Sequence, residues 1–182
     1  MWRGDLGLTD LIDRQDVPKF DLRFEVLGAL DEASSALGLV RAGAARAETK
    51  ELVLAVQRDL CWLMSELAAV GDEARPESHI DAGRLEFLES EFQRVTAGVP
   101  LGDAFVVPGD TQASAALQLA RAIIRRAERQ VTLLDREAGL PNPNIIAYLN
   151  RLSALVYALA RAEDAASGAP STIAHPSSNG HR

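Results

Sequence analysis

The chain has 182 residues, of which 47% are hydrophobic, so it can bury one substantial core but is short for two ordinary domains. Charged residues make up 25% of the sequence, a share that excludes both a highly charged disordered chain and a membrane protein. The formal net charge is -7, whereas a general nucleic-acid binder normally carries a basic excess. Composition therefore predicts one soluble domain that binds neither nucleic acid nor membrane.

The cysteine and histidine content and the short apolar runs indicate the cellular compartment and the kinds of site to expect. Cys61 is the only cysteine, which excludes an internal disulfide and fits a reducing compartment. Of the three histidines, two lie close to the C-terminus, so a histidine-based metal site is not expected. The apolar runs are short and interrupted by charge, and residues 1–5 lack the apolar stretch of a secretory signal. We therefore expect a cytoplasmic protein.

Helical periodicity begins after an N-terminal stretch that lacks it. Residues 1–19 are rich in Gly, Asp and Thr and are predicted to form an arm. From Asp21 onward, apolar residues recur at spacings of three and four, the pattern of an amphipathic helix. The first such stretch ends at Gly43, the second ends before a predicted loop at residues 71–78, and the third ends at Gly98.

The last two predicted helices have the clearest apolar stripes, whose members alternate steps of three and four. These stripes are Leu117, Ala120, Ile124, Ala127, Val131 and Leu134, and then Ile145, Leu149, Leu152, Val156 and Leu159. Together with the first three stretches, they predict an all-α domain, a five-helix up-and-down bundle over residues 20–166. From residue 167 onward, Gly, Pro, Ser and His dominate, so residues 167–182 are predicted to be a disordered tail.

The predicted fourth helix carries a polar strip beside its apolar stripe. At about 100° per residue, Arg121, Arg125 and Glu128 project within roughly 60° of one another. Runs of charge usually form solvated faces, and here such a face would contain an intrahelical ion pair between Arg125 and Glu128. Alternatively, the strip is an anion site, because guanidinium groups match phosphate oxygens and stay charged at any working pH.

The arm carries a second set of candidate groups. Residues 4–9 read Gly-Asp-Leu-Gly-Leu-Thr, and Lys19 follows. Glycines let backbone N–H groups converge on phosphates, a carboxylate can hold Mg²⁺, and a lysine adds a positive charge. The same residue types also occur in plain turns, and neither a Walker A loop nor a strand-borne G-x-G-x-x-G is present.

The remaining candidate site residues lie in the loop before the fourth helix and on one face of the fifth helix. Strand-like alternation is nearly absent except at residues 105–107, and a loop phenylalanine such as Phe105 is usually a lid over the core. On the last helix, Asn150, Ala154, Tyr157 and Arg161 follow one another at steps of four, three and four. A mid-helix Asn is more often an incidental surface residue than a ligand group.

Five blocks of this sequence occur in one order that resembles the PduO-type ATP:cob(I)alamin adenosyltransferases. They are residues 4–9, Lys19 with 21–25 and 28–32, Phe105 with 108–109, residues 125–129, and residues 148–153. The resemblance runs from about Arg3 to about Arg161. Because five blocks in the right order are more specific than any one of them, they favour the anion site over the solvated face.

The resemblance implies a ferritin-like bundle of the cobalamin adenosyltransferase type, assembled as a homotrimer with an active site between neighbouring subunits. It implies an enzyme that transfers the 5′-deoxyadenosyl group of ATP to the cobalt of cob(I)alamin, forming adenosylcobalamin and releasing triphosphate. The implied ligands are ATP, Mg²⁺ and cobalamin, and a cob(II)alamin reductase is an expected partner. By this resemblance, the residues around ATP and Mg²⁺ are Gly4, Asp5, Gly7, Thr9, Lys19, Arg125, Glu128 and Asn150.

On the corrin side, the resemblance implies that Arg121 pairs with Asp31 across the subunit interface. Phe105 would pack against the lower face of the corrin and keep the dimethylbenzimidazole off the cobalt. Removing that axial ligand makes Co(II) easier to reduce, and the resulting Co(I) is a strong nucleophile towards the 5′-carbon of ATP. With Arg125 at the triphosphate, these residues form the expected catalytic set, whose tasks are alignment of the reactants and stabilisation of the leaving group.

Four residues depart from the family pattern. Arg3 stands where the family usually has Thr, and Ser34 where the first helix normally carries Asn. Asp110 replaces the second Gly of a Pro-Gly-Gly loop, and Ala154 replaces the Asp of Asn-Arg-Leu-Ser-Asp. These departures leave an alternative open, namely a degenerate family member that binds ATP or a corrinoid as carrier or regulator without efficient turnover. A helical bundle with a purely structural role is the third reading.

Overall fold

The computed structural model of the chain describes residues 2–69, 71, 77–99, 101–102, 104–168 and 170–174. Within these residues it contains five α-helices, which confirms the predicted all-α, five-helix architecture. The helices are α1 (Leu22–Gly43), α2 (Ala47–Ala68), α3 (Ala82–Gly98), α4 (Gln112–Ala138) and α5 (Asn144–Ser167). Across the described ranges, no helix is both long enough and apolar enough to span a membrane.

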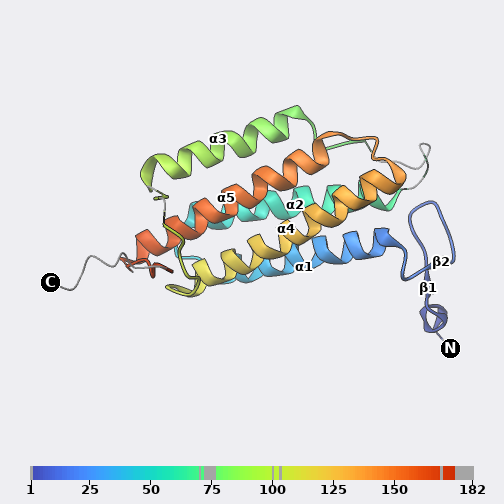
Figure 1. The fold of residues 1–182 in the computed structure, drawn as a ribbon, viewed down its shortest axis with the longest axis horizontal. Helices are drawn as coiled ribbons and strands as arrows, with labels where there is room; N and C mark the ends of the chain where they lie inside the picture. Colours follow the sequence, from blue (N-terminus) through green and yellow to red (C-terminus); the bar gives the residue numbers. More distant parts are fainter. Residues whose placement is uncertain are drawn as a thin grey trace.

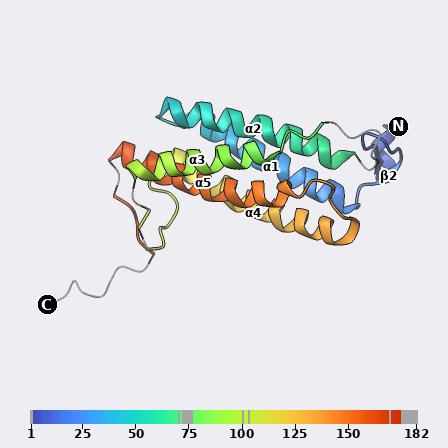
Figure 2. The same ribbon diagram turned by 90° about the horizontal axis from the view of Figure 1, so that it is seen from above.

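The helices run back and forth along one long axis, each antiparallel to the one before it in sequence (Figure 1). Helix α4 packs against both α1 and α5, whereas α2 packs on α1 and α3 packs on α5. The view turned by 90° shows the same lengthwise alignment of the helices (Figure 2). The helix with the polar strip is therefore the one with the most extensive helix–helix packing.

The sequence forms these helices because the predicted stripes pack into the core, with that of α3 only partly buried, and most helix starts are capped. The stripe residues of α4 and α5 are at most 3% exposed, which supplies the apolar burial that stabilises an amphipathic helix. The side chains of Asp21 and Asp81 accept hydrogen bonds from backbone N–H groups in the first turns of α1 and α3, both at 2.9 Å. Thr111 does the same for Ser114 at the start of α4, at 3.1 Å.

The arm folds into short elements that the sequence pattern does not predict. It consists of a 3-10 turn η1 (Arg3–Leu6) followed by strands β1 (Leu8–Thr9) and β2 (Val17–Pro18). The two strands pair antiparallel, with Leu8 opposite Pro18 and Thr9 opposite Val17. Strands of two residues are too short to show an alternating pattern. The arm lies at the end of the bundle where α1 begins (Figure 1).

The structure differs from the predicted disordered tail at residues 170–174. Helix α5 continues through Ser167 and ends at Gly168, whose φ of 70° is the left-handed conformation that favours glycine. The chain then runs beside the loop before α4, where Ile173 forms an antiparallel bridge with Val106. Its partners are remote in sequence, so local composition does not reveal them. The remainder of the predicted tail, residues 169 and 175–182, lies outside the described residues.

One buried polar cluster joins α2, α3 and α5. The Asp59 carboxylate, 8% exposed, accepts a hydrogen bond from the hydroxyl of the fully buried Tyr148 at 2.7 Å. Arg84 forms an ion pair with the same carboxylate, and its guanidinium lies 4.1 Å from the ring centre of Phe87. Burial, together with the Asp59 charge, raises the pKa of Tyr148 well above its usual value, so the hydroxyl remains a hydrogen-bond donor.

We expect Tyr148→Phe to lower the free energy of unfolding by about 1–2 kcal/mol, because a buried carboxylate loses one of its donors. Urea denaturation followed by circular dichroism measures this change. Tyr157→Phe is the matched control, since Tyr157 lies on the same helix and its hydroxyl has no hydrogen bond to any described residue. Equal stability losses in the two variants would show that the Asp59 contact contributes nothing specific.

Candidate functional site

The polar strip of α4 leaves one arginine open to solvent. Arg125 is exposed, and in the described part of the chain its guanidinium has no hydrogen-bond or ion-pair partner. The intrahelical pair between Arg125 and Glu128 expected for a solvated face does not form. Arg126 instead pairs with Glu32 of α1, and Arg129 donates to the backbone carbonyl of Arg125 at 3.0 Å. Arg125 is thus a cation available to an external anion.

Glu128 is held by a residue of the neighbouring helix. The Nδ2 of Asn150 on α5 donates to Oε1 of Glu128 at 3.1 Å. This bond joins two predicted site residues that lie 22 positions apart in sequence. Because an Asn carbonyl oxygen and a carboxylate are both acceptors, the pair presents oxygen atoms suited to a hydroxyl group or a hydrated cation, one helical turn beyond Arg125. Ala154, one turn further along α5, is also exposed.

The loop before α4 contributes an exposed aromatic ring beside a cavity. Phe105 is 81% exposed, so it is not the core lid that a loop phenylalanine usually is. Together with Val106, Pro108, Arg121 and Tyr157, it lines a cavity of about 350 Å³. Arg121 is half-buried, and its guanidinium lies 5.5 Å from the ring centre of Tyr157, within the range of a cation–π contact. Apolar walls beside a guanidinium suit a large, partly apolar ligand carrying polar groups.

The arm gathers its own candidate residues. The Nζ of Lys19 donates to the carbonyl of Gly4 at 2.9 Å, and the backbone N–H of Lys19 donates to the carbonyl of Gly7 at 2.9 Å. Gly7 has a φ of 75°, a conformation that lets the chain turn from η1 into β1. The Asp5 carboxylate accepts the backbone N–H of Trp2 at 3.0 Å, and Thr9 pairs within the hairpin.

Asp31 is exposed on α1 and does not line the cavity that contains Arg121. It lines a shallow cavity of about 510 Å³ with apolar residues that include Ile12, Phe24, Leu27 and Met64. In the described ranges, its carboxylate has no ion-pair partner. Apolar side chains gathered at the surface in this way are a feature of protein–protein contacts.

The structure therefore brings the predicted site residues together in separate groups. Arg121 and Phe105 share one cavity, Glu128 and Asn150 share a hydrogen bond, and Lys19 reaches the loop at residues 4–7. Among described residues, no hydrogen bond or ion pair joins the arm's site residues to α4 or α5. The arm and the Phe105 loop lie at opposite ends of the bundle (Figure 1). Within one chain, the described part of the arm therefore does not meet the residues around Phe105.

Two contributors were not assigned a role from the sequence. The sequence pattern puts Tyr157 on the same helix face as Asn150, but only the fold reveals that its ring lies beneath Arg121. The pattern puts Thr172 in the predicted tail, whereas in the structure its hydroxyl donates to the Asp110 carboxylate at 2.6 Å. The one signal in the sequence was Asp110 itself, an acidic residue where the resembling family has glycine.

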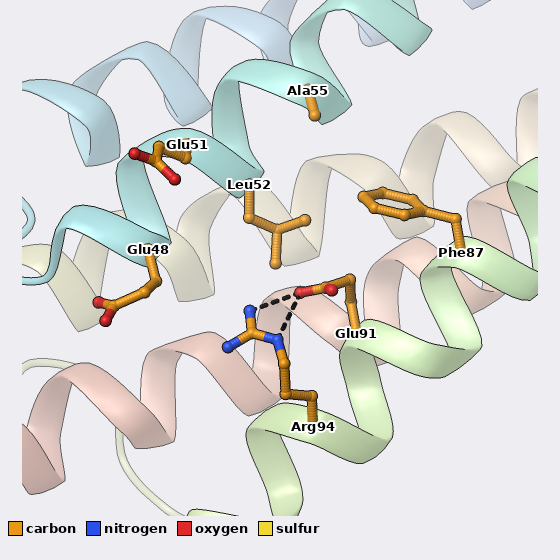
Figure 3. Close-up of a pocket in the computed structure, with 7 residues that line it drawn as sticks. All are labelled: Glu48, Glu51, Leu52, Ala55, Phe87, Glu91 and Arg94. Atoms are coloured by element: carbon orange, nitrogen blue, oxygen red, sulfur yellow. Dashed lines mark hydrogen bonds and ion pairs between the residues drawn. The ribbon is translucent and has the colours of Figure 1, made fainter.

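A further cavity lies between α2 and α3 and is unsuited to a phosphate (Figure 3). It measures about 370 Å³, and its polar lining includes Glu48, Glu51 and Glu91. The one guanidinium there, Arg94, is hydrogen-bonded to Glu91 at 3.0 Å through its Nε. Three carboxylates against one neutralised arginine would repel a triphosphate. The anion site is therefore better placed on α4.

Comparisons with known proteins find relatives over most of the chain. A protein-family model described as cobalamin adenosyltransferase matches residues 1–163. The chain is 38% identical over 162 residues to the corrinoid adenosyltransferase PduO of Salmonella typhimurium, covering 88% of this chain and 48% of that protein. It is 35% identical over 170 residues to the corrinoid adenosyltransferase of Bacillus subtilis, covering 91% and 86%. The chain thus spans about half the length of the first of these curated relatives.

Solved structures give the same match at the level of the fold. A variant of the PduO-type ATP:corrinoid adenosyltransferase of Lactobacillus reuteri, complexed with cobalamin and ATP, superimposes with a TM-score of 0.87. The two chains are 29% identical, and the match covers 96% of this chain and 97% of the other. A second variant of that protein, complexed with ATP, superimposes with a TM-score of 0.86 at 29% identity, covering 95% and 97%.

Proposed function

Because the chain belongs to the cobalamin adenosyltransferase family, we propose that it transfers the 5′-deoxyadenosyl group of ATP to the cobalt of cob(I)alamin. The products are adenosylcobalamin and triphosphate. The observation that carries the proposal is the exposed Arg125, whose guanidinium has no partner among the described residues and lies beside the bonded pair Glu128 and Asn150.

Arg125 and the arm bind different parts of ATP. Arg125 makes charge-assisted hydrogen bonds to triphosphate oxygens, while Glu128 and Asn150 accept from hydroxyl groups of the nucleotide or from a hydrated cation. The backbone of residues 4–9, with Lys19, cradles the remaining phosphate oxygens. The support for the arm's role is its local geometry, in which Lys19 already folds back over Gly4.

Mg²⁺ would be bound together with the nucleotide. In the described part of the chain, no group of three or more His, Cys, Asp and Glu side chains could hold a metal ion by itself. Magnesium in nucleotide sites commonly uses one or two carboxylates together with phosphate oxygens, and Asp5 and Glu128 fit that requirement. When bound, the ion neutralises part of the triphosphate charge.

The corrinoid would bind at the cavity lined by Phe105, Arg121 and Tyr157. A corrin ring is large and apolar with polar side groups, which matches an exposed phenyl ring next to a guanidinium. Phe105 excludes water and the displaced dimethylbenzimidazole from the lower face of the ring. That exclusion makes four-coordinate Co(II) accessible to a mild reductant.

The chemical step needs alignment more than acid–base catalysis. The electron pair of Co(I) forms the cobalt–carbon bond at the 5′-carbon of ATP, while the carbon–oxygen bond breaks and triphosphate leaves with its electrons. Arg125 stabilises the charge on the leaving group. Holding both reactants in line converts an encounter between two large molecules into an effectively unimolecular step.

Because the arm and the Phe105 loop lie at opposite ends of one subunit, we propose that two subunits of a homotrimer build each site. Asp31 of one subunit would pair with Arg121 of the next, since each lacks an oppositely charged partner among the described residues of its own chain. The apolar surface around Asp31 would be buried in the same contact.

Two features of the surroundings belong to the proposal. A cob(II)alamin reductase would supply the electron that the chain's own side chains cannot. The exposed, free Cys61 fits a reducing cytoplasm.

The alternative function, a carrier or regulator without efficient turnover, rests on Asp110 and Ala154. Anaerobic incubation with ATP, Mg²⁺ and chemically reduced cobalamin separates the two, because only the enzyme produces the adenosylcobalamin spectrum.

We expect Arg125→Ala to weaken ATP binding by at least about tenfold, since a charge-assisted contact of about 1.5–3 kcal/mol is lost. Titration calorimetry of ATP measures the change. Arg136→Ala is the control, because Arg136 is exposed on the last turn of the same helix and has no partner among the described residues. Unchanged affinity in Arg125→Ala would return the strip to a solvated face.

Assembly has its own test. We expect a trimer by light scattering at micromolar concentration, because the site is completed only between subunits. Asp31→Arg should shift the mass towards the monomer by placing like charges together, and the double variant Asp31→Arg with Arg121→Asp should restore the trimer. A wild-type monomer would exclude a shared site, and with it the enzyme as proposed.

Phe105→Ala tests the corrin side. Removal of the ring should leave ATP affinity nearly intact and sharply slow turnover that begins from Co(II), whereas turnover from preformed Co(I) should suffer less. Electron paramagnetic resonance of the wild type with Co(II)-cobalamin and ATP should show a four-coordinate signal that the variant loses. A wild type with only the five-coordinate, base-on spectrum would remove this role for Phe105 and favour the carrier.

A further inference from the structure

Residues 171–174, here called the strap, run antiparallel to the loop that carries Phe105. The backbone N–H of Val107 donates to the carbonyl of Thr172, and the N–H of Ala174 donates to the carbonyl of Phe105, both at 2.8 Å. These bonds flank the bridge between Val106 and Ile173. The strap therefore holds the backbone at Phe105 itself and at the second residue after it.

Asp110 fastens the strap with both of its carboxylate oxygens. Its Oδ2 accepts the backbone N–H of Thr172 at 2.9 Å, and its Oδ1 accepts the hydroxyl of Thr172 at 2.6 Å. The Thr172 hydroxyl, followed by the Thr172 N–H, lowers the pKa of Asp110 from its ordinary value. The charged form makes these bonds, so the contact is present above the ordinary carboxyl pKa and is lost only as pH falls through the lowered one.

The other end of the strap is tied to the bundle. Arg161 of α5 donates through Nη1 to Oγ of Ser171 at 2.6 Å and lies 3.7 Å from Asp164. Asp164 in turn accepts the hydroxyl of Thr111 at 3.1 Å, and Thr111 caps the start of α4. The strap thus connects the loop to α5 and to the first turn of the helix that carries Arg121.

An exposed ring needs this support. Phe105 is 81% exposed, so packing does little to set the direction of its side chain. What orients the ring is the backbone beneath it, and the strap supplies the hydrogen bonds that hold this backbone.

We propose that Asp110 is a positioning residue that acts through the strap to hold Phe105 in the orientation that its corrin contact requires. The clasp between Asp110 and Thr172 is a property of this chain's geometry. Its consequence for the corrinoid rests on the proposed function. Asp110 is thereby a replacement that supports the reaction, and not a sign of degeneration.

The test uses the full chain with Asp110→Asn, Thr172→Val and the double variant. Asp110→Asn should speed hydrogen exchange at the amides of Val107 and Ala174 by at least about threefold, because the amide side chain cannot accept both bonds. Thr172→Val should have a smaller effect. The double variant should match Asp110→Asn alone, since both act on one contact. Glu86→Gln, which removes one exposed carboxylate on α3, should leave this exchange unchanged.

The effect of Asp110 on function is measured through the cobalt signal and the KM for cobalamin, with the KM for ATP as the control. Asp110→Asn should reduce the four-coordinate Co(II) signal and raise the KM for cobalamin by at least about threefold, with the KM for ATP unchanged. Unchanged exchange in Asp110→Asn would overturn the clasp. Faster exchange with an unchanged cobalt signal, in an active wild type, would overturn the positioning role alone. A wild type that makes no adenosylcobalamin from preformed Co(I) would instead overturn the proposed function, and the positioning role with it.

Discussion

Burial of the apolar stripe of α4 is the constraint on which the candidate site depends. The stripe from Leu117 to Leu134 is packed between α1 and α5 with almost no exposure, and this packing sets the rotation of the helix. A strip of polar residues beside the stripe must then lie at the edge of the interface. Arg121 and Glu128 are accordingly half-buried, while Arg125 reaches solvent. The position of the guanidinium groups is a consequence of the core.

Neighbouring helices then decide which of these polar groups remain available. Arg126 forms an ion pair with Glu32 of α1. Glu128 accepts a hydrogen bond from Asn150 of α5, and Arg121 lies over the ring of Tyr157. Arg125 is left without an acceptor among the described residues. The Arg125 guanidinium is therefore available to a ligand. Leaving this charge unpaired costs the free protein little stability, because water solvates it.

Sequence periodicity predicted the five helices because their stripes repeat over many turns, and it predicted the polar strip for the same reason. It did not predict the β1–β2 hairpin, whose two-residue strands carry no repeat. It also missed the contacts of Tyr148 with Asp59 and of Thr172 with Asp110, which join residues 89 and 62 positions apart. The likeness of ordered blocks to a known family supplied candidate site residues that periodicity left ambiguous, among them Lys19 and Asn150. It could not supply the strap, which uses a residue that departs from that family.

Because the arm and the strap lie at opposite ends of the bundle, dyes attached to them could report on the two regions separately. The arm lies where α1 begins, whereas Ala174 lies beside the Phe105 loop at the far end of the bundle (Figure 1). With α4 spanning 27 residues, the two ends are separated by about 40 Å at 1.5 Å per residue, a distance near the useful range of energy transfer between dyes. Under the proposed function, a fluorophore on the arm would respond to the nucleotide, and one near the strap would respond to the corrinoid. The two ligands could therefore be followed separately as each arrives.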